Sequence, residues 1–278
     1  MIDLHCHSTA SDGVLPPAEV VQTAARLGLT AMALTDHDTT AGLGEAHAAG
    51  ARLGVEVVGG CEFSVAVDWG EMHLLAYFVE PGDPELEAFL TWARDDRSRR
   101  ARDMVSRLTG LGLAVSYDDV LRESGGGAIG RPHVARALFQ RGHVHTIQQA
   151  FDRYIGRGRP AFVEKDLPPL ARVADLVHAK GGVVSAAHLK NYGTLANLTR
   201  LKEQGLDAVE TRHPSHSGDQ LANITDAGMA LGLARTGGSD WHGESAAAGA
   251  HAQLGSQQVP DEWLTELRAR RPAPASSP

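Results

Sequence analysis

The sequence has few of the features that tie a chain to a membrane, to a disulfide framework or to nucleic acid. Only two of its 278 residues are cysteine, and no hydrophobic run approaches the roughly 20 residues that cross a bilayer. The first residues carry no basic and apolar signal segment. Lys and Arg total 26 against 34 Asp and Glu, so the formal charge of −8 argues against a protein that coats nucleic acid. We expect a cytoplasmic globular protein with no membrane contact and no obligate protein partner.

The chain alternates between apolar stretches typical of strands and amphipathic stretches typical of helices. The expected strands are residues 2–7, 31–35, 55–62, 182–187, 206–211 and 233–237, with a hairpin of residues 63–67 and 72–79 around Asp68-Trp69-Gly70. The expected helices between them are residues 16–27, 41–53, 195–204 and 218–231. Strands that alternate with helices form parallel βαβ units, and about seven such strands suggest an α/β barrel.

The middle of the chain has a different pattern, because no strand interrupts its helical spacing. Helical patterns cover residues 84–112, 117–123, 132–141 and 146–155. We predict a barrel formed by residues 1–93 and 161–270, with a helical insertion of residues 94–160 that covers it as a lid. Residues 271–278 are rich in Pro, Ala and Ser and are expected to form a disordered tail.

Several charged or reactive side chains have an ordinary structural interpretation. The long helix carries a run of arginines, namely Arg94, Arg97, Arg99, Arg100, Arg102 and Arg107. We interpret this run as a solvated face balanced by neighbouring aspartates, with the steering of a polyanionic substrate as the alternative. Cys6 and Cys61 are expected to pack as buried thiols. Five histidines are expected at the surface: His47, His143, His145, His178 and His251.

The chain contains 14 histidines, and many of them stand with carboxylates at the ends of the expected strands. His5 and His7 are two apart in the first strand, so their side chains share one face. Later strands are followed by ionisable residues at Asp36-His37-Asp38, Glu62, His188, Glu210, His213, Asp240 and His242. In a barrel of parallel strands these ends converge on one mouth, which is where the active site lies.

Such a cluster predicts bound metal ions, because several carboxylates cannot stay ionised together without cations. Mixed imidazole and carboxylate ligands without thiolate suit Mn, which we expect, with Fe or Zn as alternatives. At three or four protein ligands for each ion, about nine ligands would hold two to three metals.

The same residues resemble the motifs of the polymerase and histidinol phosphatase (PHP) superfamily over nearly the whole chain. The motifs are Asp3-Leu4-His5-Cys6-His7-Ser8, Ser11-Asp12-Gly13, Thr35-Asp36-His37-Asp38, Glu62, His73-Leu74-Leu75, His188 and Gly238-Ser239-Asp240-Trp241-His242. The resemblance implies a distorted seven-stranded (β/α) barrel with a trinuclear metal centre. It also implies the ligand sets: His5, His7, Glu62 and Asp240 for one metal, Glu62, His73 and His188 for a second, and Asp12, His37 and His242 for the third.

Within this superfamily, the insertion is similar to that of the nucleoside 3′,5′-bisphosphate phosphatase and 5′–3′ exoribonuclease group. The shared segments are Gly130-Arg131-Pro132-His133-Val134-Ala135-Arg136 and Ser215-His216-Ser217. The resemblance implies that Arg131 and His133 face substrate phosphate. The chain departs from the group at His188-Leu189-Lys190-Asn191, where many members have His-Pro-x-Arg. Lys190 offers a positive charge there without the bidentate fork of Arg.

These residues predict a metal-dependent phosphoesterase, because a metal cluster can clamp a phosphoryl group and generate hydroxide near neutral pH. We expect Arg131, Lys190 and the pair His213 and His216 to bind phosphate, and His216 or His213 to act as general acid. The expected substrate is the 3′-phosphate of a nucleoside 3′,5′-bisphosphate, with short RNA trimmed 5′–3′ by the same chemistry. The alternatives are a general or histidinol-type phosphatase, a metal-dependent C–N hydrolase on the same barrel, and a non-catalytic metal-binding domain.

Overall fold

A computed structural model describes residues 1–243 and 253–272, and these residues contain a seven-stranded sheet. The strands follow one another in sequence order: β1 (Ile2–Cys6), β2 (Ala31–Leu34), β3 (Glu56–Val67), β4 (Gly70–Tyr77), β5 (Val183–Ala186), β6 (Ala208–Arg212) and β7 (Ala234–Gly237). An isolated bridge joins Cys6 in β1 to Trp241 just after β7, so the sheet curls into a nearly closed barrel. The predicted α/β barrel is confirmed.

The barrel is distorted at β4, which runs antiparallel to both of its neighbours while the other adjacent strands pair in parallel. The two stretches expected at residues 55–62 and 63–67 form one continuous strand, β3, whose second half makes the predicted hairpin with β4. Glu62 pairs with Leu75, and His73 lies two residues from Leu75 along β4. Glu62 and His73 therefore project from the same face of the hairpin.

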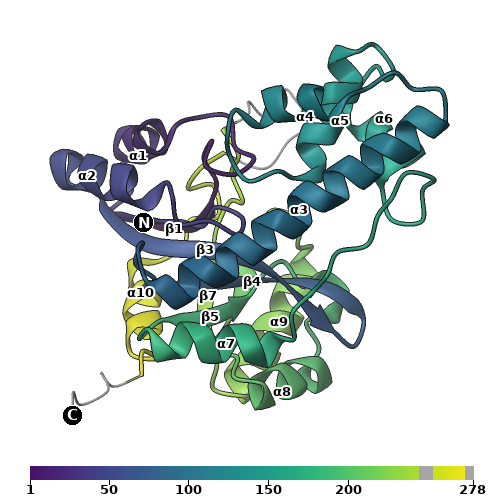
Figure 1. The fold of residues 1–278 in the computed structure, drawn as a ribbon. Helices are drawn as coiled ribbons and strands as arrows, with labels where there is room; N and C mark the ends of the chain where they lie inside the picture. Colours follow the sequence, from purple (N-terminus) through teal and green to yellow (C-terminus); the bar gives the residue numbers. More distant parts are fainter. Residues whose placement is uncertain (244–252, 273–278) are drawn as a thin grey trace.

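Helices cover the outside of the sheet (Figure 1): α1 (Pro17–Arg26), α2 (Leu43–Leu53), α7 (Leu170–Ala179), α8 (Leu195–Glu203) and α9 (Gly218–Ala230). Their apolar faces and the sheet form one large core, which includes the buried thiols of Cys6 and Cys61, as expected. A second core fills the barrel interior, and α10 (Asp261–Arg268) packs Trp263, Leu264 and Leu267 against it. Sequence analysis did not predict α7 or α10.

The helical insertion extends from the barrel on a single long helix. α3 (Pro84–Gly110) begins beside the barrel at its N-cap, Asp83, and continues without a break into the insertion (Figure 1). The shorter elements α4 (Tyr117–Ser124), α5 (Arg131–Gln140), α6 (Ile147–Ala150) and η1 (Phe151–Ile155) pack with its second half around a separate hydrophobic core. The boundary expected at residue 94 falls inside α3, so the barrel and the insertion share this helix.

The arginine run on α3 is not a uniformly solvated face, which corrects the sequence interpretation. Arg99 is exposed and pairs with aspartates on its own helix, as expected. Arg97 and Arg100, however, are buried. Arg97 contacts Asp38 of the barrel and Arg100 donates to the main-chain carbonyl of Val163, because α3 is covered on two sides at this level.

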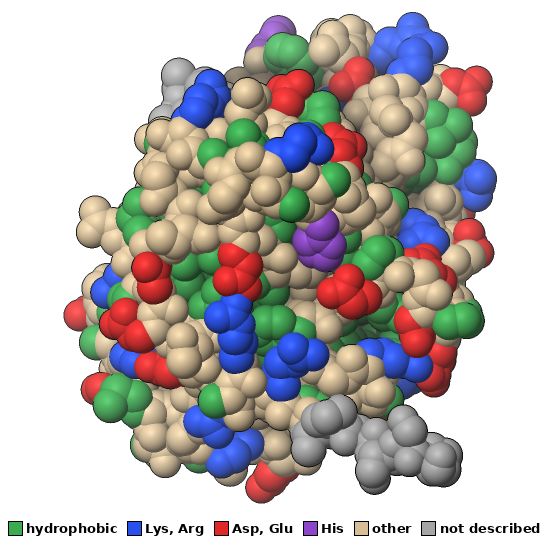
Figure 2. Space-filling view, turned by 90° about the vertical axis from the view of Figure 1, so that its left-hand side faces the viewer, with side chains coloured by type: hydrophobic (Ala, Val, Ile, Leu, Met, Phe, Trp, Pro, Cys, Tyr) green, Lys and Arg blue, Asp and Glu red, His purple; other side chains and the backbone are tan. Residues whose placement is uncertain are grey.

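One face of the molecule carries a mixture of charges. On the face that Figure 2 shows, acidic and basic side chains are interspersed and hydrophobic side chains are scattered between them. Within the described residues, no helix has the length and the apolar character needed to cross a bilayer. His178, expected at the surface, is partly covered by its contact with Asp207. His251 and most of the expected tail lie outside the described residues.

Candidate metal centre

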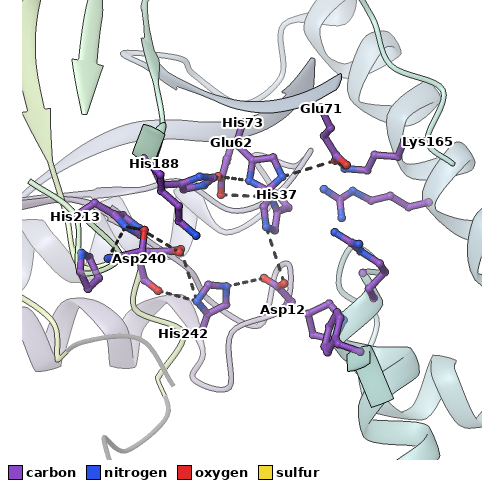
Figure 3. A pocket seen from close by; sticks show the side chains of 18 of the residues that line it. Asp12, His37, Glu62, Glu71, His73, Lys165, His188, His213, Asp240 and His242 are labelled. Atoms are coloured by element: carbon purple, nitrogen blue, oxygen red, sulfur yellow. Dashed lines mark hydrogen bonds and ion pairs between the residues drawn. The ribbon is translucent and has the colours of Figure 1, made fainter. Parts of the chain in front are cut away.

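The nine side chains predicted as metal ligands come together at one end of the barrel. Three of them lie on strands: His5 on β1, Glu62 on β3 and His73 on β4. The other six lie in loops that follow strands, namely His7, Asp12, His37, His188, Asp240 and His242. The close-up in Figure 3 shows most of them around one cavity. His5 and His7 are fully buried against Glu62 and Asp240.

Glu62 lies at the centre of this cluster, with imidazoles on both of its carboxylate oxygens. Its Oε2 is 3.2 Å from Nε2 of His5 and 3.1 Å from Nε2 of His7. Its Oε1 is 2.7 Å from Nδ1 of His73 and 3.2 Å from Nε2 of His188. One carboxylate thus faces two groups of donors, which is the arrangement expected of a ligand that bridges two cations.

A further group of donors gathers around Asp12. Nε2 of His242 is 3.3 Å from its Oδ1, and Nε2 of His37 is 3.9 Å from its Oδ2. One ligand atom from each of these residues and from His7 lies within 4.8 Å of the others. Asp240 connects this group to the first, because its Oδ1 is 3.2 Å from Nε2 of His7 and 3.8 Å from Nδ1 of His242.

The donors fit divalent cations better than a closed network of hydrogen bonds. Both ring nitrogens of His7 and Nδ1 of His37 are buried and make no hydrogen bond of good geometry in the described part of the chain. Carboxylate oxygens nevertheless lie 3.1–3.3 Å from Nε2 of His7 and Nδ1 of His37. Burial alone would raise the pKa of Glu62, but His37, His73 and His5 hold that pKa well below its ordinary value. Buried polar atoms without partners are costly. A set of His and carboxylate atoms aimed at shared points is therefore suited to coordinating metal ions.

Two carboxylates of the sequence motifs hold the loops that carry these donors. Asp3 accepts hydrogen bonds from the backbone N–H groups of His5 and Ser239, which ties β1 to the loop after β7. Asp36 accepts hydrogen bonds from two serine hydroxyls in the loop after β1. The motif residues that do not face the cavity thus fix the positions of those that do.

Glu210 was noted in the sequence at the end of a strand but was given no role. Its carboxylate is 3.0 Å from Nδ1 of His5 and accepts a hydrogen bond of 2.8 Å from the backbone N–H of His188. A carboxylate on one ring nitrogen of a histidine fixes the tautomer and directs the other nitrogen toward a metal. Glu210 therefore orients Nε2 of His5 toward Glu62.

The backbone is strained where two donors enter the cavity. His188 and Asp240 have φ angles of 34° and 51°, in the left-handed region that residues other than glycine rarely adopt. Gly238 packs so closely on β1 that an added Cβ would lie 2.4 Å from the Cβ of His5. Strain of this kind persists only where the surrounding structure enforces it, and it clusters at functional sites.

A cavity of about 620 Å³ separates the metal donors from the insertion. Of the residues predicted to bind substrate, it is lined by Arg131, Lys190 and His213. It is also lined by three cations that sequence analysis did not assign to the site, namely Arg97, Arg100 and Lys165. Lys165 and its neighbour Glu71 lie on the side of the cavity away from Asp240 and His213 (Figure 3). The cavity therefore has a metal-binding side and a cationic side.

The cations on the insertion side are anchored but not fully paired. Arg97 forms an ion pair with Asp38, while its Nη2 is buried without a hydrogen-bond partner among the described residues. Nζ of Lys165 is 3.2 Å from Oε1 of Glu71, and burial together with Arg97 lowers the pKa of this lysine to about 8. Arginine binds phosphate oxygens through strong charge-assisted hydrogen bonds, so this wall is suited to an anionic group.

The structure does not place His133 or His216 on the cavity wall, in contrast to the sequence expectation. Nδ1 of His133 accepts the backbone N–H of Gly130 at 2.9 Å, so this buried ring caps α5 instead of facing phosphate. Burial lowers the pKa of His133 to about 4. Nδ1 of His216 is 2.9 Å from the carbonyl oxygen of Thr211, and its Nε2 is 3.4 Å from the backbone N of Lys190. Each of these histidines therefore uses at least one ring nitrogen in a hydrogen bond with the main chain.

Comparison with known proteins agrees with this geometry. The PHP domain family model matches residues 3–193, which is more than half of the chain. The chain belongs to the PHP domain family. It is 34% identical to a 5′–3′ exoribonuclease of Haemophilus influenzae over 86% of this chain and 89% of that protein. It is 36% identical to a 3′,5′-nucleoside bisphosphate phosphatase of Chromobacterium violaceum, covering 87% of each chain.

A solved structure gives the same result for the fold. A Bifidobacterium adolescentis protein described as a metal-dependent phosphoesterase superposes with a TM-score of 0.88 and 30% identity, covering 98% of this chain and 97% of that one. The PHP chain described here is accordingly a hydrolase that acts on phosphoric ester bonds. Its His, Asp and Glu clusters are the groups that can hold the divalent metals.

Proposed function

We propose that this PHP phosphoesterase removes the 3′-phosphate from nucleoside 3′,5′-bisphosphates and also trims short RNA from its 5′ end. The observation that carries the proposal is the two-sided cavity, with metal donors on the barrel side and Arg97, Arg100, Arg131 and Lys165 among its other lining residues. A substrate with two phosphates can place one on each side. The names of two relatives, a bisphosphate phosphatase and an exoribonuclease, support this choice.

The donor groups would hold three divalent metals, with Mn expected and Fe or Zn as alternatives. The first would be held by His5, His7, Glu62 and Asp240, the second by Glu62, His73 and His188, and the third by Asp12, His37 and His242. When bound, such metals polarise phosphoryl oxygens and supply a nucleophilic water near neutral pH.

The cations of the chain hold and orient the substrate. Arg97 lines the cavity and can attract the phosphate that does not react through its positive charge. The guanidinium of Arg131 lies 5.7 Å from the centroid of the Phe162 ring, which holds it at the cavity. Lys190 is exposed, lines the cavity and can also contact a phosphate. Two anchored phosphates fix the sugar between them and limit the orientations in which the reacting group can lie.

Protonation of the leaving O3′ is assigned to His213. It lines the cavity and is 4% exposed, with Nε2 3.4 Å from Oδ2 of Asp240 and Nδ1 2.8 Å from the hydroxyl oxygen of Ser215. A general acid must lie within reach of the oxygen that it protonates. His216, the other candidate, does not line this cavity, and both of its ring nitrogens contact the main chain.

In this proposal the barrel of residues 1–93 and 161–270 carries the chemistry, and the insertion of residues 94–160 selects the substrate. The insertion contributes the guanidinium groups that would contact the phosphate that does not react. We place this activity in the cytoplasm and expect it to need no protein partner.

The experiment that tests this proposal is a hydrolysis panel with Mn-loaded protein. We expect adenosine 3′,5′-bisphosphate to yield adenosine 5′-monophosphate with a kcat/KM at least about tenfold above that of p-nitrophenyl phosphate or histidinol phosphate. The reason is that one additional charge-assisted contact contributes about 1.5–3 kcal/mol. The control is the same panel after metal removal with EDTA. Preference for histidinol phosphate, or cleavage of an amide with no phosphatase activity, would contradict the proposal.

A further inference from the structure

We propose that a second groove, next to the metal-site cavity, is a subsite for the nucleotide that follows the scissile phosphate, with its base stacked on Trp69 and Tyr192. This inference rests on the proposed function and names the part of the molecule that would accept an oligonucleotide. It depends on the position of the groove, on its aromatic side chains and on its charge.

The groove is continuous with the metal-site cavity. It has a volume of about 670 Å³ and runs between the β3–β4 hairpin and the loop after β5. It shares five lining residues with the metal-site cavity, namely Glu71, His73, Arg131, His188 and Lys190. Two of these are candidate metal ligands, so a chain whose phosphate lies at the metals can continue directly into the groove.

Three aromatic side chains line this groove, and two of them form a stacked pair. The rings of Trp69 and Tyr192 stack with 5.3 Å between their centroids and 5° between their planes. Trp69 is half-buried in the hairpin turn, whereas Tyr192 is 50% exposed. Phe162 is a third aromatic residue of the lining. Exposed aromatic rings beside a nucleic-acid path bind bases by stacking, which tolerates any sequence because every base has a π-face.

The groove lining carries three cations against two carboxylates, Glu71 and Glu164, so its charge is positive by one. Glu71 is itself paired with Lys165. Arg131 and Lys190 stand at its junction with the metal-site cavity, and Arg157 lies farther along it. The Arg157 guanidinium crosses the hairpin turn so closely that a Cβ added to Gly70 would lie 3.0 Å from its Nη1. Cations along a groove that also carries aromatic rings are the combination found in sites for single-stranded nucleic acid.

The proposed reaction balances for an oligonucleotide in this orientation. Water oxygen forms the new bond to the scissile phosphorus, the bond from phosphorus to O3′ of the first nucleotide breaks, and O3′ takes a proton. The products are a nucleoside 5′-monophosphate and a chain that is one nucleotide shorter and carries a 5′-phosphate. The shortened chain can bind again in the same way. A bisphosphate lacks the following nucleotide and leaves the groove empty.

The stacked pair also has a purely structural interpretation, because it joins the hairpin turn to the loop that carries Lys190. In that case its loss would loosen Lys190 and would slow the hydrolysis of every phosphate ester. The two interpretations therefore differ in how they affect long and short substrates.

The test compares Trp69→Ala, Trp69→Phe and wild type on three substrates: a 5′-phosphorylated tetranucleotide, adenosine 3′,5′-bisphosphate and p-nitrophenyl phosphate. Stacking of a base contributes about 1–3 kcal/mol, so we expect Trp69→Ala to lower kcat/KM for the tetranucleotide by about 5- to 150-fold, mainly through KM. The two short substrates should change by less than about twofold, and Trp69→Phe should restore most of the tetranucleotide activity. The control is Phe139→Ala, which removes an exposed aromatic ring on the insertion, outside the groove.

The outcomes separate this inference from the proposed function. Equal losses on all three substrates, or no loss on the tetranucleotide, would overturn the subsite. Wild type that cleaves the bisphosphate but not the tetranucleotide would also overturn it, while leaving the bisphosphate activity in place. Wild type that cleaves neither nucleotide would overturn both.

Discussion

The two sides of the metal-site cavity are formed by different kinds of side chain. On the barrel side, short imidazole and carboxylate side chains project from strands or from the loops after them, and are buried or partly buried against one another. On the insertion side, long guanidinium and ammonium side chains come from α3, from the start of α5 and from the coil near Lys165. The barrel side can hold metals at fixed points, and the insertion side can bind a phosphate through its positive charge. In the proposed function, this contrast separates catalysis from substrate selection.

The largest effect is expected on the barrel side, from Asp240→Ala. Asp240 contacts both His7 and His213, so its loss should remove at least one metal. Loss of metal charge removes several kcal/mol of transition-state stabilisation, and we expect activity on the bisphosphate to fall by about a thousandfold or more. Elemental analysis and steady-state kinetics measure the two effects. Asp175→Ala, on the exposed face of α7, is the control. Full metal content with full activity in Asp240→Ala would refute the assignment.

A smaller and more selective effect is expected from His213→Gln. General acid catalysis contributes about 10²-fold or more, so kcat for the bisphosphate should drop by about a hundredfold. p-Nitrophenyl phosphate should be nearly unaffected, because its leaving group departs without a proton. The same comparison on His216→Gln should show no such selectivity. Equal losses of His213→Gln on both substrates, or loss of metal from this variant, would mean that His213 serves the metal centre instead.

The smallest effects are expected on the insertion side, where Arg131 and His133 form a matched pair at the start of α5. Arg131→Ala should lower kcat/KM for the bisphosphate by about ten- to a hundredfold, because it removes a charge-assisted contact. It should lower kcat/KM for p-nitrophenyl phosphate by a smaller factor. His133→Ala should leave this ratio unchanged and lower the free energy of unfolding by about 1–3 kcal/mol, since it removes a buried cap. Kinetics and urea unfolding distinguish the two. A loss of activity in His133→Ala that is larger for the bisphosphate than for p-nitrophenyl phosphate would mean that His133 contacts the substrate phosphate.

The barrel side could be predicted from the sequence because strand ends converge in space. Once His5 and His7 were placed on one strand face, the ionisable residues after later strands had to meet them. The role of Glu210 could not be read in this way, because a carboxylate at a strand end can bind a metal or orient a histidine. Only its distance of 3.0 Å from Nδ1 of His5 shows that it contacts a ligand.

The insertion side could be predicted much less well, because the positions of its side chains depend on how helices pack. The spacing of the arginines on α3 is the same whether a face meets solvent or a neighbouring domain, so Arg97 and Arg100 could not be separated from Arg99. Lys165 lies in a coil without periodicity. His133 did carry a local signal, since it is in the first turn of a helix after Gly130, where caps are common.

In the proposed function, the continuity of α3 determines how the enzyme can discriminate between substrates. The helix has 27 residues, a length of about 40 Å, and no Pro or Gly between Glu85 and Thr109 at which it could kink. Arg97 and Asp38 clamp its middle to the barrel. The insertion therefore has no hinge within this helix, and the gap beneath it is set before any ligand arrives. Substrates would be selected by the distance between their two phosphates, which must match a gap of fixed width. Closure of the insertion around the substrate would not contribute.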